Sequence, residues 1–133
     1  MSEMPYVDGF VIAIPKKNLE DYKKMAEKGR DIWMKHGAVD YKECVGEDMN
    51  PNMDEIGVDE NMKAGTFPQL VNAKEAEVVV FSYIVFKSRA HRDEVNAKVM
   101  SDPEMSPEAF KDKPMPFEMN RMCYGGFESI VSA

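Results

Sequence analysis

The segment EVVVFSYIVFKSRAHRDEVNAKVMSDP, from Glu77 to Pro103, decides the fold of this chain. Its first part, Val78 to Phe86, is apolar at nearly every position and predicts a strand that is buried on both faces. Its second part, Arg89 to Met100, has the mixed charge of a surface helix, with Ser88 as the expected N-cap. A strand of this kind must be covered on both sides of its sheet, so the rest of the protein has to supply two covering layers.

The remaining chain predicts four further regular elements, of which three are strands. They are a strand at Tyr6–Ile14, a helix at Leu19–His36 capped by Asn18 and stopped by Gly37, a half-exposed or edge strand at Val39–Val45, and a last strand at Arg121–Val131, bent or bulged at Gly125 and Gly126. The order strand, helix, strand, strand, helix, strand is that of the ferredoxin-like βαββαβ fold. We therefore predict one α+β domain over residues 1–133, with an antiparallel sheet.

Two helices can cover only one face of such a sheet. The other face of the apolar central strand then needs a different cover, and a second copy of the protein supplies one. We expect a homodimer that forms through the open face of the sheet.

The connection from Gly46 to Ala76 has no clear period and is long for a compact domain. Its acidic, Asn-rich composition predicts a flap or a partly disordered loop. Asp48, Asn50, Asn52 and Asp54 alternate as the ligands of a calcium loop do. Met53 stands where that loop needs glycine, however, so we predict an acidic loop without bound metal.

Composition narrows the function classes. A net charge of −7 argues against binding to nucleic acid or to anionic membranes, because phosphate affinity comes from clustered Lys and Arg. No run approaches the roughly 20 apolar residues of a membrane span, and the N-terminus does not resemble a secretion signal. We expect a cytoplasmic protein in which Cys44 and Cys123, both in predicted strands, are buried free thiols.

Motifs for cofactors and for covalent catalysis are missing from the sequence. His36 and His91 are the only imidazoles, and no pair of cysteines or histidines has metal-binding spacing. Both histidines are interpreted as structural residues. No glycine-rich loop precedes a helix, and no Gly-x-Ser-x-Gly motif occurs, so we predict neither a nucleotide cofactor nor a serine nucleophile.

The predicted helix at Arg89–Met100 carries polar residues where an apolar face is expected. Arg92 and Asn96 border the stripe formed by Val95 and Val99. A buried Arg92 demands a carboxylate or carbonyl groups, and Asn96 demands donors and acceptors. Two interpretations stay open: an internal network that anchors the helix, or side chains that anchor a ligand.

Several blocks of the sequence resemble one bacterial family. They are YVDGF (Tyr6–Phe10), IPKK (Ile14–Lys17), HGA (His36–Ala38), YKECV (Tyr41–Val45), TFP (Thr66–Pro68), VVFSYIVFKSRAHRDEVNAKVMSDP (Val79–Pro103), MPF (Met115–Phe117) and RMCYGGFE (Arg121–Glu128). The chain is similar to the DUF1428 or YbaA-like family of uncharacterised proteins. The resemblance implies a dimeric α/β-barrel, in which two ferredoxin-like subunits pack sheet against sheet. That larger fold group includes small monooxygenases, isomerases, haem-degrading proteins and ligand-sensing domains.

Three hypotheses of function follow. The first is a homodimer that binds a small apolar or aromatic molecule in an apolar cleft between sheet and helices. The second, by fold analogy, is a cofactor-independent monooxygenase- or isomerase-like enzyme, and the third is a structural or regulatory dimer without a ligand. The candidate cleft residues are Trp33, Tyr41, Tyr83, Arg92, Asn96, Phe117 and Arg121.

Overall fold

The computed structural model describes residues 4–50 and 64–133 of the chain. Its strands are β1 (Tyr6–Pro15), β2 (Asp40–Val45), β3 (Glu77–Phe86) and β4 (Met122–Glu128), and its α-helices are α1 (Leu19–Lys35), α2 (Phe67–Leu70) and α3 (Arg89–Met100). Short 3₁₀ turns occupy Lys16–Asn18, Pro103–Met105, Pro107–Phe110 and Met119–Arg121.

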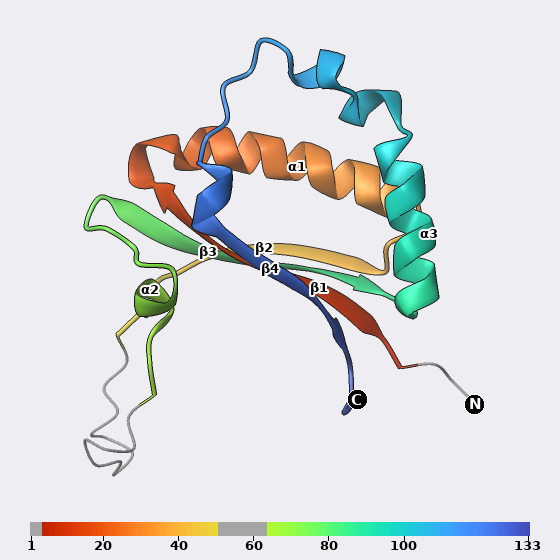
Figure 1. The fold of residues 1–133 in the computed structure, drawn as a ribbon, viewed down its shortest axis with the longest axis horizontal. Coiled ribbons are helices and arrows are strands. Elements are labelled where there is room, and N and C mark those ends of the chain that lie inside the picture. Colours follow the sequence, from red (N-terminus) through yellow and green to blue (C-terminus); the bar gives the residue numbers. More distant parts are fainter. Residues whose placement is uncertain (1–3, 51–63) are drawn as a thin grey trace.

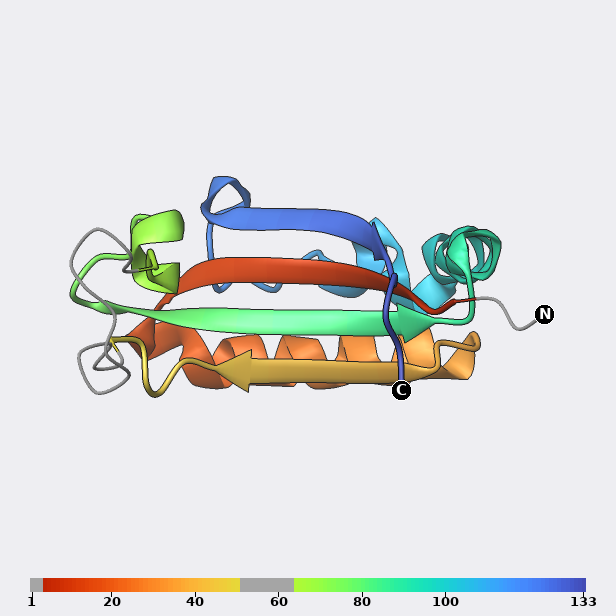
Figure 2. The ribbon, with the colours of Figure 1, turned by 90° about the horizontal axis from the view of Figure 1, so that it is seen from below.

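The four strands form one antiparallel sheet in the order β2-β3-β1-β4 (Figure 2). The apolar strand β3 lies inside the sheet, next to β1, and β2 is an edge strand, as the sequence predicted. The prediction of an α+β chain with an antiparallel sheet is therefore confirmed for the described residues.

Both long helices cover the same face of the sheet, as Figure 1 shows. The side chains of β1 and β3 that point to this helix-facing side alternate with those that point away, because successive residues of a strand face opposite sides. The fully buried core between sheet and helices includes Ile14, Ile32, Val80, Phe86, Val95 and Val99. The described residues cover the opposite side, which we call the open face, only at one end, where α2 and Val71 pack near Ala13 and Val79.

The pairing of β4 with β1 is uninterrupted, so of the two predicted alternatives, a bend or a bulge at the glycines, the bulge is wrong. Gly125 pairs with Gly9 and Gly126 with Asp8 in an uninterrupted register. Gly126 is needed for space instead, since a Cβ atom there would lie within 2.9 Å of the ring of Tyr6. The tyrosine ring lies across the neighbouring strand at the position where β4 has no side chain.

The ends of α1 also differ from the prediction. Asn18 does not cap the helix with its side chain; its Nδ2 donates to the carbonyl oxygen of Pro116 at 2.9 Å. A 3₁₀ turn leads into the helix, and this turn lets Asn18 bind the segment before β4. At the other end, His36 is the C-cap and Gly37 has a φ of 111°, a left-handed conformation that favours glycine.

Neither cysteine is buried, which corrects the expectation of buried thiols. Cys44 lies on β2 and Cys123 on β4, at opposite edges of the sheet, and both are exposed and free. Strand residues in the middle of a sheet are covered by neighbours, but an edge strand on an open face leaves its side chains accessible.

The segment from Gly46 to Ala76 contains a short helix that the sequence prediction missed. Thr66 accepts a hydrogen bond from the backbone amide of Gln69, and the Gln69 side chain accepts from the amide of Thr66, forming a capping box that starts α2. The pattern Thr-x-x-Gln was the available signal. Most of the rejected calcium-loop pattern lies in 51–63, outside the described residues.

A buried carboxylate joins the end of α1 to the end of α3. Asp102 accepts hydrogen bonds from Nζ of Lys35 at 2.8 Å and from the backbone amide of Glu104 at 2.9 Å, and its Oδ2 lies 2.7 Å from Nε2 of His36. Its side chain is 2% exposed. These hydrogen bonds, first of all that from Lys35, hold the pKa of Asp102 well below its usual range.

Replacement of Asp102 by Asn is expected to lower the melting temperature at pH 7. The effect has a predictable pH dependence, because a carboxylate whose folded pKa is depressed stabilises the fold above its unfolded pKa of about 3.9 and loses that contribution as the pH falls. The difference between wild type and Asp102→Asn should therefore shrink between about pH 5 and pH 3. Thermal denaturation across this range tests it, with the exposed Asp112→Asn as control. A difference that does not change with pH contradicts the prediction.

Candidate functional site

The seven residues predicted to border one cleft are distributed over several places. Trp33, Arg92 and Asn96 lie together on the helix-facing side of the sheet, in contact through α1, α3 and β1. Tyr83 is on the open face, beside Phe81, with the sheet between it and the two long helices. One cleft cannot include both sets.

Of the other three predicted residues, Tyr41 packs against the same apolar cluster as Trp33, whereas Phe117 and Arg121 lie elsewhere. Tyr41 donates its hydroxyl to Glu43 on β2, on the far side of β3 from β1. Phe117 is buried edge-on against Tyr22, with ring centroids 5.8 Å apart. Arg121 binds Glu77 at 2.5 Å and the carbonyl of Asn72 at 3.0 Å, which ties the start of β4 to the start of β3. The ligand-binding role of these residues stays a prediction.

The centre of the group around α3 is an ion pair between Arg92 and Asp8. Nη1 of Arg92 donates to Oδ1 of Asp8 at 2.9 Å, and Nε donates to Asp93 at 2.8 Å. Both members are largely buried, with side-chain exposures of 18% for Arg92 and 9% for Asp8. The carboxylate that a buried Arg92 was predicted to need is therefore present. It comes from β1.

Burial and the ion pair with Arg92 change the pKa of Asp8 in opposite directions. Loss of water raises the pKa of the Asp8 carboxyl, and this effect exceeds the lowering caused by Arg92 and by Asn96. The guanidinium of Arg92 also lies 4.9 Å from the ring centroid of Tyr6, a cation–π distance. Asp8 is thus a buried carboxyl that gives up its proton less readily than an ordinary aspartic acid.

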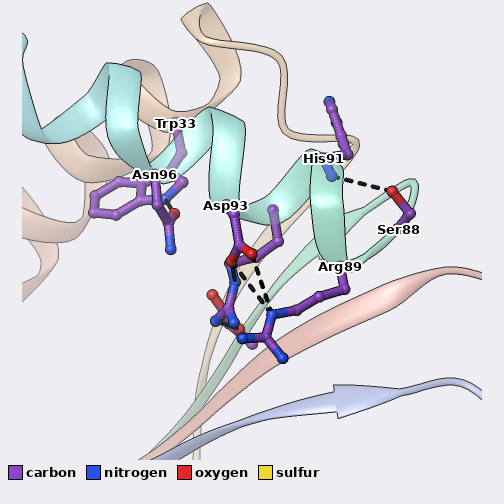
Figure 3. A network of polar contacts seen from close by, with 8 residues as sticks. Trp33, Ser88, Arg89, His91, Asp93 and Asn96 are labelled. Atoms are coloured by element: carbon purple, nitrogen blue, oxygen red, sulfur yellow. Dashed lines mark hydrogen bonds and ion pairs between the residues drawn. The ribbon is translucent and has the colours of Figure 1, made fainter.

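Asn96 and Trp33 extend the network along α3 toward α1 (Figure 3). Nε1 of Trp33 donates to Oδ1 of Asn96 at 3.0 Å, which fixes the indole against α3. The amide nitrogen of Asn96 is directed to the Asp8 side, where it helps to lower the pKa of Asp8. Asn96 therefore connects the indole to the ion pair.

An accessible pair of aromatic rings adjoins this polar group. Phe10 follows Asp8 by two residues on β1 and so points to the same side of the sheet. Its ring is stacked with that of Tyr124 on β4, with centroids 5.9 Å apart and planes 15° apart. Tyr124 is 73% exposed, so this part of the helix-facing side is open at the β4 edge.

We call this arrangement the Asp8–Arg92 site. It consists of Asp8, Phe10, Trp33, Arg92, Asn96 and Tyr124. It combines aromatic surface for stacking with amide and guanidinium donors, the combination that small-molecule sites use. Among the described residues, no group of three or more His, Cys, Asp or Glu side chains is arranged to hold a metal ion.

Asp8, Phe10 and Tyr124 were missed by the sequence prediction. A signal existed for Asp8, because it alternates with Tyr6, Phe10 and Ile12 on the buried face of an apolar strand, where a charge needs a partner. Tyr124 carried no such signal. Its role depends on β4 lying next to β1, which the local sequence does not reveal.

The fold and the site together define a small α+β protein with an antiparallel sheet and a polar cluster beneath its second long helix. The model of the family described as "Protein of unknown function (DUF1428)" matches residues 5–119. "Uncharacterized protein YbaA" of Escherichia coli K12 is 41% identical over 128 residues, which covers 96% of this chain and 98% of that protein. The same identity and coverage hold for the proteins of that name from Escherichia coli O157:H7 and Shigella flexneri. The chain belongs to the DUF1428 family, as the resemblance in its sequence indicated. No helix in the described part is both long and apolar enough to cross a membrane.

Removal of the Arg92 charge should expose the structural role of the ion pair. Arg92→Gln leaves Asp8 buried without its cation, and we expect a loss of about 3 kcal/mol in the free energy of unfolding at pH 7. The loss should be smaller at acidic pH, where Asp8 is protonated. Urea denaturation at fixed protein concentration measures both.

Arg89 offers a matched control on the same helix. It also pairs with Asp93 and faces the Tyr6 ring, but its side chain is 66% exposed. Arg89→Gln should change the stability by no more than about 0.5 kcal/mol. Equal effects of the two substitutions would contradict the assignment of Arg92 as the partner of Asp8.

Proposed function

We propose that the protein is a homodimer that binds a small molecule with an aromatic or apolar ring at the Asp8–Arg92 site. The dimer forms through the open face of the sheet, as two ferredoxin-like subunits of a dimeric α/β-barrel. The element order and the strand order β2-β3-β1-β4 support this arrangement, because they agree with the ferredoxin-like pattern. A cytoplasmic location is favoured by the two free thiols, because free thiols persist best in a reducing compartment.

The open face supports self-association. Its central side chains are apolar, and Phe81 in the middle of the sheet is 43% exposed. A hollow of about 610 Å³ is lined by Val7, Val11, Phe67, Leu70, Phe81, Tyr83 and Phe127 of this face, and also by Phe10 and Tyr124 of the Asp8–Arg92 site at the β4 edge. The charged strand residues on this side, Asp40, Lys42 and Glu77, lie on the edge strand or at a strand end. A large apolar surface of this kind marks an interaction site.

The observation that carries the ligand proposal is the exposed ring of Tyr124 beside the buried ion pair. The exposed ring of Tyr124 adds little to the packing of the core, but it offers a surface on which the ring of a ligand can stack. In this proposal the guanidinium of Arg92 and the amide of Asn96 donate to a polar group on the same ligand. This gives the apolar contact and the orienting hydrogen bonds that binding sites combine.

Asp8 favours a second candidate function, a cofactor-independent isomerase-like enzyme. A buried carboxyl with a raised pKa is suited to transfer protons, since its two protonation states are closer in free energy at neutral pH. Turnover would separate this candidate from simple binding. Asp8→Asn would abolish turnover and leave a stacked ligand bound.

The dimer is tested by a charge at the centre of the open face. Phe81→Glu should convert the dimer to a monomer, because a carboxylate buried in an apolar interface costs several kcal/mol, and each 1.4 kcal/mol weakens association about tenfold. Native mass spectrometry reads the subunit number and any retained ligand mass in one spectrum. Met34→Glu on the outer side of α1, where the side chain is 42% exposed, is the control and should stay dimeric. A monomeric wild-type protein would refute the dimer.

The ligand site is tested with 2-naphthoate, an aromatic carboxylate, by isothermal titration calorimetry. Loss of one stacking ring in Tyr124→Ala should weaken binding up to about tenfold, as aromatic pairs contribute roughly 0.5–1.5 kcal/mol. Phe67→Ala, which removes a ring from the open-face hollow, should leave the affinity unchanged. Weakening by Phe67→Ala alone would place the probe in the hollow and contradict the proposed site, as would an absence of binding to the wild type.

A further inference from the structure

A second polar centre lies on the helix-facing side of the sheet, between α1 and the edge strand β2. The carboxylate of Glu43 receives two phenol hydroxyls. Tyr22 on α1 donates to Oε2 at 2.7 Å, and Tyr41 on β2 donates to Oε1 at 2.8 Å. Burial first, and then the negative charge of Glu43, raises the pKa of both tyrosines well above the ordinary value, so both phenols remain protonated donors.

The local sequence accounts for this geometry. Tyr41 and Glu43 are two residues apart on β2 and therefore share one side of the sheet. Tyr22 is buried on the inner side of α1, with 5% exposure. Gly29 on the same helix makes room for Tyr41, because a Cβ atom at Gly29 would lie 3.1 Å from the Tyr41 hydroxyl oxygen. The two rings thus hold Glu43 in one orientation from both sides.

A pocket of about 460 Å³ opens at this carboxylate. Its walls are the two tyrosines and the apolar side chains of Leu19, Ala26, Val45 and Val80. Charged residues stand around it: Glu20, Lys23, Glu27, Arg30 and Lys42. The volume is in the range of sites for small ligands, and an apolar wall with a carboxylate at its end, inside a charged rim, is an arrangement that such sites use.

The lining holds three cations and three carboxylates, but the carboxylate of Glu43 has no cationic partner among the described residues. No lysine or arginine in the described ranges forms an ion pair with Glu43. Among the surrounding cations, Lys42 is paired with Asp40 at 2.7 Å and Arg30 with Asp31 at 3.0 Å. Lys23 is then the one uncommitted cation of the described lining, against the three carboxylates Glu20, Glu27 and Glu43. A cation that enters the pocket is therefore electrostatically favoured.

We propose that this pocket binds a small primary organic ammonium ion whose nitrogen donates to the carboxylate of Glu43 and whose apolar body rests on Ala26 and Val80. A carboxylate has about four lone-pair positions, and the two phenols occupy two of them. The rings of Tyr22 and Tyr41 add the aromatic surface on which cations bind. Strand β3 lies between Glu43 on β2 and Asp8 on β1, so the two carboxylates belong to different polar groups, although Trp33 and Tyr41 pack against one apolar cluster.

The test compares three probes of similar shape in calorimetric titrations of the full-length protein. They are 2-phenylethylammonium, the neutral 2-phenylethanol and the anionic 3-phenylpropanoate. The ammonium should bind at least about tenfold more tightly than the alcohol, since a charge-assisted hydrogen bond contributes about 1.5–3 kcal/mol. The anion should not bind. Equal affinity for ammonium and alcohol would overturn the proposal without any variant.

Glu43→Gln locates the bound ammonium. Glutamine has nearly the same shape and keeps an oxygen acceptor, so the fold should persist, while the affinity for 2-phenylethylammonium falls at least about tenfold. Glu108→Gln, on an exposed turn away from the pocket, is the matched control and should bind as the wild type does. Unchanged binding by Glu43→Gln would overturn the proposal. Tyr124→Ala, which tests the Asp8–Arg92 site, should not change the affinity for 2-phenylethylammonium. The two sites are therefore tested independently of each other.

Discussion

The structure depends on one constraint, which is that strand β3 is apolar on both faces while the long helices cover only one of them. Ile84 and Phe86 are buried beneath α1 and α3, whereas Phe81 on the alternate face is 43% exposed. A β-strand cannot direct all of its side chains to one side, because its period is two residues. The apolar side chains of β3 that the long helices do not cover therefore lie on the open face. The short helix α2 covers only one end of that face (Figure 1).

The same two-residue period sets out both polar sites on the helix-facing side. Asp8 on β1 and Tyr41 on β2 are both register partners of Ile84, and Phe10 and Glu43 are both partners of Ser82. Each set of three partners forms a row across β1, β3 and β2. In both rows the residues of β1 and β2 are polar or aromatic, whereas the β3 residue between them is apolar (Ile84) or small (Ser82). Helix α3 supplies Arg92 to one site, and α1 supplies Tyr22 to the other. The buried carboxylate of Asp8 and the half-buried carboxylate of Glu43 both have hydrogen-bond donors.

Sequence signals such as helix caps predicted correctly those features that depend only on neighbouring residues. Ser88 caps α3 through its hydroxyl, which accepts from the amide of His91 at 3.0 Å, and α3 has the predicted bounds. Asn18 has the same capping chemistry but binds Pro116, a residue 98 positions away, because the segment before β4 passes over the start of α1. The bulge predicted at Gly125 and Gly126 failed for a similar reason: the need for glycine arose from the Tyr6 ring of another strand.

The sequence by itself determined the four strands and the two long helices, the central position of β3, the need of Arg92 for a carboxylate and the family to which the chain belongs. Periodicity, capping and the cost of an unpaired buried charge are properties of a residue and its near neighbours. Only the tertiary structure decided that Asp8 is the partner of Arg92, that Tyr83 faces away from the helices and that Tyr41 joins Tyr22 at Glu43. These contacts follow from the strand order and from the crossing of α1 over the sheet, which bring together residues far apart in the chain.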